Sequence, residues 1–252
     1  MTNKFSVYAL AAVTALSTLT TNAFANGDKT YVVATEAGYA PYEYLDSKGH
    51  IVGFDIDLIN YVCKHAGIKC KVENQGFDAL IPNLKFKKVD IAIAAITVTP
   101  ERAKQVAFSQ EYLPGAGYSY LTLTNNNYAS VNDLKAVGYQ NGTLAGKYLS
   151  EKTKAKTVTY DTYDTALLDL KAGRINALFA DAAVVAKYAE NDKNYKVYGE
   201  AVVDPILGQG LAIAVHPKNK DLLAKINAAL AEAKSSGFIE QLKAKYGVTH
   251  AE

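Results

Sequence analysis

The sequence predicts an α/β fold built as two lobes, with the chain crossing between them twice. Short β-rich runs alternate with amphipathic helical segments along most of the 252 residues, which is typical of mainly parallel sheets covered by helices. This alternation restarts midway along the chain, and glycine and proline cluster at 115–117 and 205–210. We therefore place one lobe at residues 26–116 plus 210–252 and the other at 117–209, with the crossovers at these clusters.

The first lobe begins with two predicted βα units. Residues 30–35 form a β-rich run, and apolar side chains then recur at helical spacing over 54–66 until Gly67 stops the helix. The same patterns predict a strand at 69–73 and a helix at 78–87. Strands separated by helices in this way favour parallel pairing.

A nearly continuous apolar run at 90–96 is typical of a central strand that is buried on both faces. It leads directly into the polar segment 97–102, which contains two threonines and Arg102. Ligands of open α/β sheets bind at the carboxyl ends of strands, so this segment is the first candidate for a site.

The second lobe repeats the alternation of strands and helices. Its predicted strands lie at 118–123, 136–140, 158–160 and 177–179, and its predicted helices at 143–150, 162–171 and 182–189. The chain then continues with an apolar, strand-like run at 210–215 and two amphipathic helices at 221–234 and 238–243. We expect these last elements to pack back on the first lobe.

Residues 1–25 are expected to be a signal peptide. Lys4 supplies a positive start, an apolar stretch covers 5–19, and an A-x-A cleavage site ends at Ala25. The stretch is shorter than the roughly 20 residues that span a bilayer, which argues against a transmembrane anchor. No cysteine follows the cleavage site, which argues against a lipid anchor, and no later segment reaches membrane-spanning length. We expect the mature protein, from Asn26, to be soluble in an exported compartment.

Charge and cysteine content limit the classes of protein to which this sequence can belong. Lysine and arginine number 27 against 25 acidic residues, a net charge of +2, which argues against the basic surface needed to bind nucleic acid. Arg102 and Arg174 are the only arginines, and guanidinium suits bidentate carboxylate recognition where lysine does not.

Cys63 and Cys70 are the only cysteines. Export favours a disulfide between them over the alternative of two free buried thiols.

The sequence offers no constellation for catalysis or metal binding. The histidines, His50, His65, His216 and His250, are isolated from one another, with no pair at the i, i+4 spacing of a helical metal site and no cluster of cysteine and histidine. Nucleotide-binding and serine-nucleophile signatures such as G-x-G-x-x-G, the P-loop and G-x-S-x-G are absent. We expect no catalytic residue, metal or cofactor. A glycine turn at 139–142 before Thr143 can bind an anion through backbone N–H groups, a weak signal by itself.

Potential recognition groups do follow the predicted strands, namely Tyr39 with Pro41 and Tyr42, then Phe77, Thr97, Arg102, Thr143 and Asp181. Taken singly, each has a simpler explanation. Tyr39 and Phe77 can be core or surface aromatics, Arg102 a surface charge, and Asp181 the N-cap of the following helix.

Taken together, these groups lie in motifs that resemble the polar amino-acid binding proteins of ABC importers. The motifs are Gly-Tyr-Ala-Pro-Tyr-Glu-Tyr at 38–44, Gly-His-Ile-Val-Gly-Phe-Asp-Ile-Asp-Leu at 49–58, Phe-Asp-Ala-Leu-Ile-Pro-Asn-Leu at 77–84, Ile-Thr-Val-Thr-Pro-Glu-Arg at 96–102 and the segment 170–181. The resemblance covers essentially the whole mature chain and implies a two-lobed periplasmic binding protein fold. The spacing of Cys63 and Cys70 also recurs in the branch that binds basic amino acids, and the likeness is greatest to arginine-binding members.

The resemblance implies that a ligand is held by its α-carboxylate and α-ammonium groups. Arg102, the hydroxyl of Thr97 and a backbone N–H around Thr143 and Leu144 would bind the carboxylate. Charge-assisted hydrogen bonds of this kind each contribute roughly 1.5 to 3 kcal/mol. Asp181 and the main-chain carbonyl near Ala95 would bind the ammonium.

The ligand side chain would lie between Tyr39 and Phe77, with Glu36 at its distal end. A carboxylate beside aromatic faces suits a guanidinium or ammonium group. Where family members often carry serine or glycine this sequence has Ala94 and Ala95, and it has Leu144 where they carry a polar residue. Gln140 is a possible replacement contact, and the departures leave the exact ligand open.

The sequence thus predicts a monomeric periplasmic protein that captures a basic L-amino acid, with arginine as the first choice, by hinge closure. It would deliver this ligand to an inner-membrane ABC permease without catalysing a reaction. The main alternative is an exported dehydratase-like enzyme on the same fold. Lysine, histidine, ornithine and glutamine stay open as ligands, and so does an added role in surface or host contact.

Overall fold

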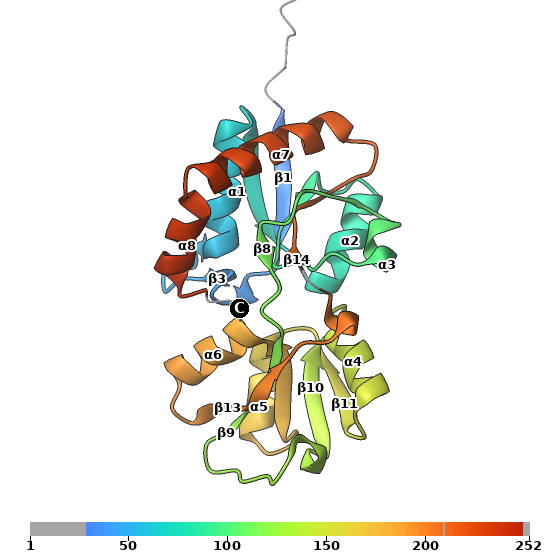
Figure 1. Ribbon diagram of the computed structural model, residues 1–252, viewed down its shortest axis with the longest axis vertical. Coiled ribbons are helices and arrows are strands. Elements are labelled where there is room, and N and C mark those ends of the chain that lie inside the picture. Colours follow the sequence, from blue (N-terminus) through green and yellow to red (C-terminus); the bar gives the residue numbers. More distant parts are fainter. Residues whose placement is uncertain (1–28, 209, 249–252) are drawn as a thin grey trace, which may run out of the picture.

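The computed structural model describes residues 29–208 and 210–248, which form two lobes joined by two chain crossings (Figure 1). Each lobe is built on a five-stranded sheet with helices packed against it. The predicted signal peptide and its cleavage site at Ala25 lie outside the described residues. In the described part of the chain, no helix combines the length and the apolar character needed to cross a bilayer.

The sheet of the first lobe has the strand order β5-β1-β6-β15-β7. These strands are β5 (Lys69–Asn74), β1 (Thr30–Thr35), β6 (Ile91–Ala92), β15 (Ala214–Val215) and β7 (Ala107–Phe108). β1 pairs in parallel with β5 and β6, whereas β15 runs antiparallel to β6 and β7. The C-terminal part of the chain therefore completes the sheet that its N-terminal part begins.

Five helices belong to this first lobe, and Figure 1 shows α7 lying across α1 and β1. They are α1 (Phe54–His65), α2 (Phe77–Lys85), α3 (Pro100–Ala103), α7 (Lys220–Ser235) and α8 (Phe238–Tyr246). A small antiparallel sheet of β2 (Gly38–Tyr39), β3 (Glu43–Leu45) and β4 (Ile51–Val52) leads into α1. This small sheet lies at the edge of the lobe that faces the second lobe.

The second lobe has the strand order β11-β10-β12-β9-β13. Its strands are β11 (Lys156–Tyr160), β10 (Ala136–Gln140), β12 (Ala177–Asp181), β9 (Tyr118–Leu123) and β13 (Tyr195–Val202). Its helices are α4 (Ala145–Lys152), α5 (Tyr163–Lys171) and α6 (Ala182–Asn191), with short 3-10 turns η1 (Val131–Asp133) and η2 (Pro205–Leu207). The carboxyl ends of β10 and β12 point toward the first lobe.

The crossings between the lobes contain a two-stranded antiparallel ladder of β8 (Leu113–Pro114) and β14 (Gly210–Leu211). Tyr112 donates its backbone N–H to the carbonyl of Leu211 over 2.9 Å, which extends the ladder toward the first lobe. Two short strands joined by so few hydrogen bonds are the usual form of a hinge, because small φ/ψ changes there move whole domains.

Two predicted strands are wrong in extent. The run at 90–96 contains only β6, and the chain beyond Ala92 leaves the ladder and reaches Ala95 with a φ of 44°. The run is apolar because residues 91–96 are all buried, not because all of them pair in the sheet. The run at 210–215 likewise divides between β14 of the hinge and β15 of the sheet.

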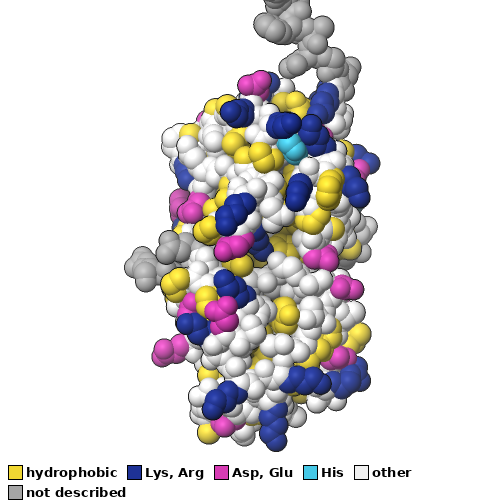
Figure 2. Space-filling view, turned by 90° about the vertical axis from the view of Figure 1, so that its right-hand side faces the viewer, with side chains coloured by type: hydrophobic (Ala, Val, Ile, Leu, Met, Phe, Trp, Pro, Cys, Tyr) yellow, Lys and Arg dark blue, Asp and Glu magenta, His cyan; other side chains and the backbone are white. Residues whose placement is uncertain are grey.

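Other helices and strands lie within a few residues of their predicted places, and β13 is the main element that the sequence interpretation missed. It is an antiparallel edge strand whose pairing with β9 is irregular between Tyr198 and Val202. The sheets are consequently mixed rather than mainly parallel. Figure 2 shows lysine and acidic side chains interspersed over one face of both lobes.

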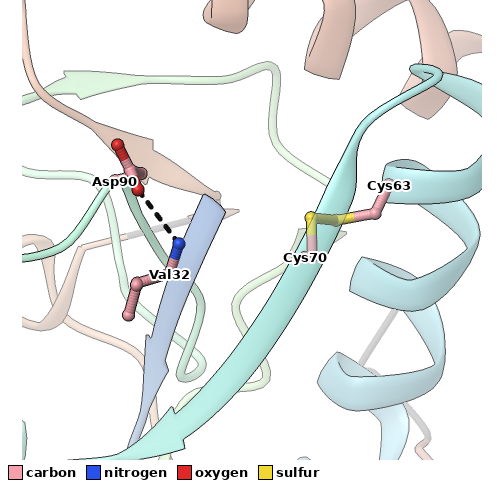
Figure 3. Close-up of a disulfide and its surroundings, with 4 residues drawn as sticks. All are labelled: Val32, Cys63, Cys70 and Asp90. Carbon is pink, nitrogen blue, oxygen red and sulfur yellow. Dashed lines mark hydrogen bonds between the residues drawn. A yellow bond between two sulfur atoms is a disulfide. The ribbon is translucent and has the colours of Figure 1, made fainter. Parts of the chain in front are cut away.

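The predicted disulfide is present. Cys63 in the last turn of α1 is bonded to Cys70 in β5, with Cα atoms 6.2 Å apart, and thereby fixes the end of the helix to the edge of the sheet (Figure 3).

The Cys63→Ser/Cys70→Ser variant is expected to lose about 2.5 kcal/mol of unfolding free energy, because a seven-residue separation closes a short loop in the unfolded chain. Urea unfolding followed by circular dichroism measures this loss. An unchanged urea midpoint for the double variant would contradict the assigned role of the bridge.

Candidate functional site

A cavity between the lobes is lined by side chains from both sheets. It is narrow in this closed form and is bounded by Tyr39, Phe77, Ala95, Thr97, Arg102, Tyr118, Gln140 and Thr143. The first five of these residues belong to the first lobe, and the other three lie in β9, at the end of β10 and in the turn before α4. Opposite halves of one cavity therefore come from elements that the hinge can separate.

Arg102 is a buried cation whose described partners are backbone carbonyls. Its side chain lies on the short helix α3, which Thr99 caps by accepting the Arg102 backbone N–H. Nη1 donates to the carbonyl of Thr97 over 2.9 Å and Nη2 donates to the carbonyl of Gly142 over 3.1 Å. Arg102 is only 8% exposed, and this burial lowers the pKa of its guanidinium. Among the described residues, no carboxylate forms an ion pair with it.

The guanidinium of Arg102 also lies over the Phe77 ring, 5.5 Å from its centroid. Guanidinium carries five N–H donors, and two carbonyls accept from only two of them. Arg102 thus retains the bidentate donor geometry that matches a carboxylate.

Asp181 is the corresponding buried anion on the other side of the cavity. It ends β12 and caps α6 by accepting the Ala183 N–H at Oδ1 over 2.9 Å, so the simpler explanation considered for it, an N-cap, describes one of its contacts. Tyr42 donates its hydroxyl to the same oxygen over 3.3 Å. The residue is 7% exposed, and burial raises its pKa to about 6. No cation among the described residues contributes to this shift.

Tyr118 is close enough to both charges to interact with each of them. Burial raises the pKa of its phenol, the charge of Asp181 raises it further, and the charge of Arg102 lowers it. Both charges thus act on one ring that borders the cavity. The sequence interpretation missed Tyr118, because a tyrosine in an apolar strand looks like an ordinary core residue.

Thr97, Thr143 and Leu144 lie near Arg102, as predicted. Thr97 and Thr143 border the cavity, and the Thr143 hydroxyl donates to the carbonyl of Gln140 over 2.6 Å. Leu144 instead precedes α4 and lines an adjoining hollow together with Arg102. The structure therefore places Leu144 beside the cavity and not in its lining.

Glu36 and Gln140 form the other end of the site. Burial raises the pKa of Glu36, a hydrogen bond with Gln140 lowers it, and the charge of Asp164 raises it. One carboxylate oxygen of Glu36 has no hydrogen-bond partner among the described residues. Gln140 borders the cavity, and Glu36 lies behind it. This end of the site carries excess negative charge.

Tyrosines support this part of the site. Tyr39, which borders the cavity, stacks on Tyr163 with ring centroids 5.2 Å apart and on Tyr42 with centroids 6.1 Å apart. Its hydroxyl accepts the backbone N–H of Asp181 over 3.2 Å. Tyr42 was among the candidate recognition groups of the sequence, whereas Tyr163 is a further residue that the sequence interpretation missed.

Hydrogen bonds between the lobes hold the described structure closed. Besides the contacts of Asp181 with Tyr39 and Tyr42, Asn141 donates to Asp78 over 3.1 Å. Gly142 has a φ of 75°, and a Cβ there would lie 2.8 Å from the Cα of Asp78 in the opposite lobe. The turn after β10 therefore approaches α2 more closely than any side chain at position 142 allows.

Comparison with known proteins places this geometry in a family. Residues 31–249 match the bacterial extracellular solute-binding proteins, family 3. The chain belongs to this family. The predicted two-lobed periplasmic binding protein fold with two hinge crossings is confirmed.

Relatives of this solute-binding protein are named for arginine binding. ABC transporter arginine-binding protein 1 of Escherichia coli is 41% identical over 210 residues, covering 82% of this chain and 86% of that protein. The arginine-binding periplasmic protein of Mannheimia haemolytica is 37% identical over 217 residues, covering 85% and 90%. A solved Salmonella typhimurium periplasmic binding protein described for high arginine specificity is 42% identical, with a TM-score of 0.83, and the match covers 86% of this chain and 99% of that one. These relatives are binding proteins and not enzymes, as expected for this chain.

The cavity thus brings together most of the predicted site residues of this solute-binding protein. Tyr39, Phe77, Ala95, Thr97, Arg102, Gln140 and Thr143 border it, while Glu36, Leu144 and Asp181 lie directly behind or beside them. Their individual roles in binding stay predictions. In the described part of the chain, no group of three or more histidine, cysteine or acidic residues is arranged to hold a metal.

Proposed function

We propose that this solute-binding protein captures L-arginine from the periplasm and presents it, in the closed form, to an inner-membrane ABC permease. The observation that carries the proposal is the pair of buried, oppositely charged side chains on opposite lobes. Arg102 and Asp181 both act on Tyr118, and each lacks a counter-ion among the described residues.

A free α-amino acid supplies the missing counter-ions. Its carboxylate would accept hydrogen bonds from Arg102 and the Thr97 hydroxyl, with a backbone N–H near Thr143 and Leu144 as a further donor. Its ammonium would donate to Asp181 and to the carbonyl of Ala95. Each buried charge then gains an opposite charge, which offsets the free energy lost by removing it from water.

The side-chain end favours a cation over a neutral group. Glu36 carries an unpartnered carboxylate oxygen, and Asp164 adds negative charge nearby. A guanidinium can hydrogen-bond to Glu36 and Gln140 while it lies against Tyr39 or Phe77. The names of the relatives favour arginine over lysine, histidine, ornithine and glutamine.

Closure of the lobes would complete the site. We place the lobes at residues 26–116 plus 210–252 and 117–209, so that Arg102 and Asp181 lie on different lobes. The protein is proposed to act as a monomer after removal of residues 1–25, because one chain supplies both halves of the cavity.

Isothermal titration of protein that has been unfolded and refolded, to strip carried-over ligand, tests the proposal. We expect arginine to bind with a Kd of about 1 μM or tighter, equivalent to roughly 8 kcal/mol. Arg102→Ala is expected to weaken binding by at least about 100-fold, since it removes the partner of a buried carboxylate. Arg174→Ala is the matched control, because Arg174 pairs with Asp169 on the surface and borders no part of the cavity. No heat with any amino acid, or equal losses in both variants, would overturn the proposal.

Glu36→Gln is expected to weaken arginine binding by about 30-fold or more and glutamine binding by less than about threefold, because only arginine loses a charge partner. Competition of each ligand against labelled arginine measures both values. Glu73→Gln, which alters a surface carboxylate paired with Lys71 in the same lobe, serves as the control. Equal losses for arginine and glutamine would refute the role assigned to Glu36.

Gly142→Ala is expected to weaken arginine binding by roughly tenfold, because the added Cβ meets Asp78 only in the closed form. Gly173→Ala is the control, since Gly173 has a φ of 71° but no atom within 4 Å of the point that a Cβ would occupy. Both variants carry the same backbone strain, so their ligand-free melting temperatures should fall alike. An affinity loss in Gly173→Ala as large as that in Gly142→Ala would contradict closure around this contact.

A further inference from the structure

A second buried acidic group lies behind the cavity, on the first lobe. Asp55, in the first turn of α1, accepts the backbone N–H of Ala95 at Oδ2 over 2.7 Å. The same oxygen accepts the hydroxyl of Tyr112 over 2.9 Å. One carboxylate oxygen therefore joins a cavity-lining residue to the residue that precedes hinge strand β8.

Glu43 of β3 is in contact with Asp55 and is completely buried. Neither Glu43 oxygen, nor Oδ1 of Asp55, receives a hydrogen bond from a donor among the described residues. Two carboxylates in contact without a donor between them repel each other. A single proton removes the repulsion, because a carboxylic acid donates to a neighbouring carboxylate.

The charges around this pair strengthen the same conclusion. Burial raises the pKa of Glu43 well above its usual value, and the charges of Asp55, Glu36 and Asp181 raise it further. Burial raises the pKa of Asp55 to about 6, against the lowering effect of its hydrogen bonds from Ala95 and Tyr112 and of its interaction with Glu43. No lysine, arginine or histidine contributes to either shift.

Ala95 is the residue that this arrangement holds. Its φ of 44° lies in the left-handed region, which is sterically unfavourable for an alanine. The hydrogen bond from its N–H to a buried carboxylate stabilises this conformation. The orientation of the Ala95 carbonyl at the cavity thus depends on Asp55.

We propose that Glu43 and Asp55 share one proton and that Asp55 is a positioning residue, which fixes the Ala95 carbonyl for the α-ammonium group of the ligand. This inference rests on the proposed binding of arginine. Neither acid touches the ligand. Asp55 acts through the backbone of Ala95. The protonated Glu43 donates a hydrogen bond to Asp55, so that Asp55 stays ionised and the pair carries a single negative charge.

The positioning role is tested with arginine and with 5-guanidinopentanoate, which is arginine without its α-amino group. Asp55→Ala is expected to weaken arginine binding by about tenfold and the deamino analogue by less than about twofold, because only arginine uses the Ala95 carbonyl. Asp55→Asn is expected to restore arginine binding, since its amide oxygen still accepts from Ala95 and its amide N–H can donate to Glu43. Asp57→Ala is the matched control on the same helix, where Asp57 accepts from Lys245 and Tyr246 on the surface.

The shared proton is tested in the ligand-free protein, by a measurement that does not require Asp55→Ala to fold. A group whose folded pKa is raised contributes stability below its unfolded pKa and loses it as the pH rises through the folded pKa. Near neutral pH the folded pair holds one proton and the unfolded chain holds none. We expect the slope of the logarithm of the unfolding constant against pH, between about pH 7 and 8, to be smaller in Glu43→Gln than in the wild type by about one. Glu73→Gln is expected to keep the wild-type slope.

The outcomes separate this inference from the proposed function. Equal losses for arginine and the deamino analogue in Asp55→Ala, or no rescue by Asp55→Asn, would overturn the positioning role. An unchanged slope in Glu43→Gln would overturn the shared proton. A wild-type protein that does not bind arginine would instead overturn the proposed function, while the slope measurement would still decide the protonation of the pair.

Discussion

The closed form depends on how two buried charges are compensated. Arg102 and Asp181 are almost fully removed from water, and each is stabilised only by uncharged hydrogen-bond partners in the described structure. Closing the lobes without a ligand therefore buries two unpaired charges, which is costly at low dielectric. The proposed zwitterionic ligand would pair with both charges at once. It would then stabilise the closed form more than the open form, which is all that a ligand needs in order to shift the equilibrium between them.

Tyrosines make this closure possible because they combine an apolar ring with a polar hydroxyl. Tyr39 and Tyr42 of the first lobe reach the backbone and the carboxylate of Asp181 in the second. In the opposite direction, Tyr188 of the second lobe donates its hydroxyl to the carbonyl of Gly38 in the first lobe over 3.2 Å. The rings exclude water from the interface, and the hydroxyl groups satisfy polar atoms that closure would otherwise leave unpaired. The chain contains 18 tyrosines and no tryptophan, which is consistent with this use of the phenol group.

Most helices and strands could be predicted because their apolar side chains recur with a clear period. The run at 90–96 could not be assigned correctly, because burial makes a segment apolar whether or not it pairs in a sheet. The small sheet before α1 was missed because its strands have two or three residues, too few to show a period. In each case the missing information lies in the tertiary structure, which the local sequence does not show.

The candidate site could be predicted where a charged residue follows a strand, as with Arg102 and Asp181. Tyr118 and Tyr163 could not, because nothing in a local sequence distinguishes a tyrosine beside a cavity from one in the core. Glu43 and Asp55 lie in the motifs at 38–44 and 49–58 but had no predicted role, since their contact joins β3 to α1. A proton shared between two acids depends on that contact and on burial, and neither is visible in the sequence.

The arrangement separates recognition of the amino-acid backbone from recognition of the side chain. In the proposed complex, Arg102 and Asp181 would bind charges that every free α-amino acid carries, so they would set affinity without distinguishing one side chain from another. Discrimination would then depend on Glu36, Gln140 and Asp164, where burial and repulsion between acids leave a carboxylate oxygen of Glu36 without a partner among the described residues. A neutral ligand leaves that carboxylate uncompensated, whereas a guanidinium relieves it. The proposed preference for a cation would thus come as much from the cost of leaving Glu36 unpaired as from the attraction of the correct ligand.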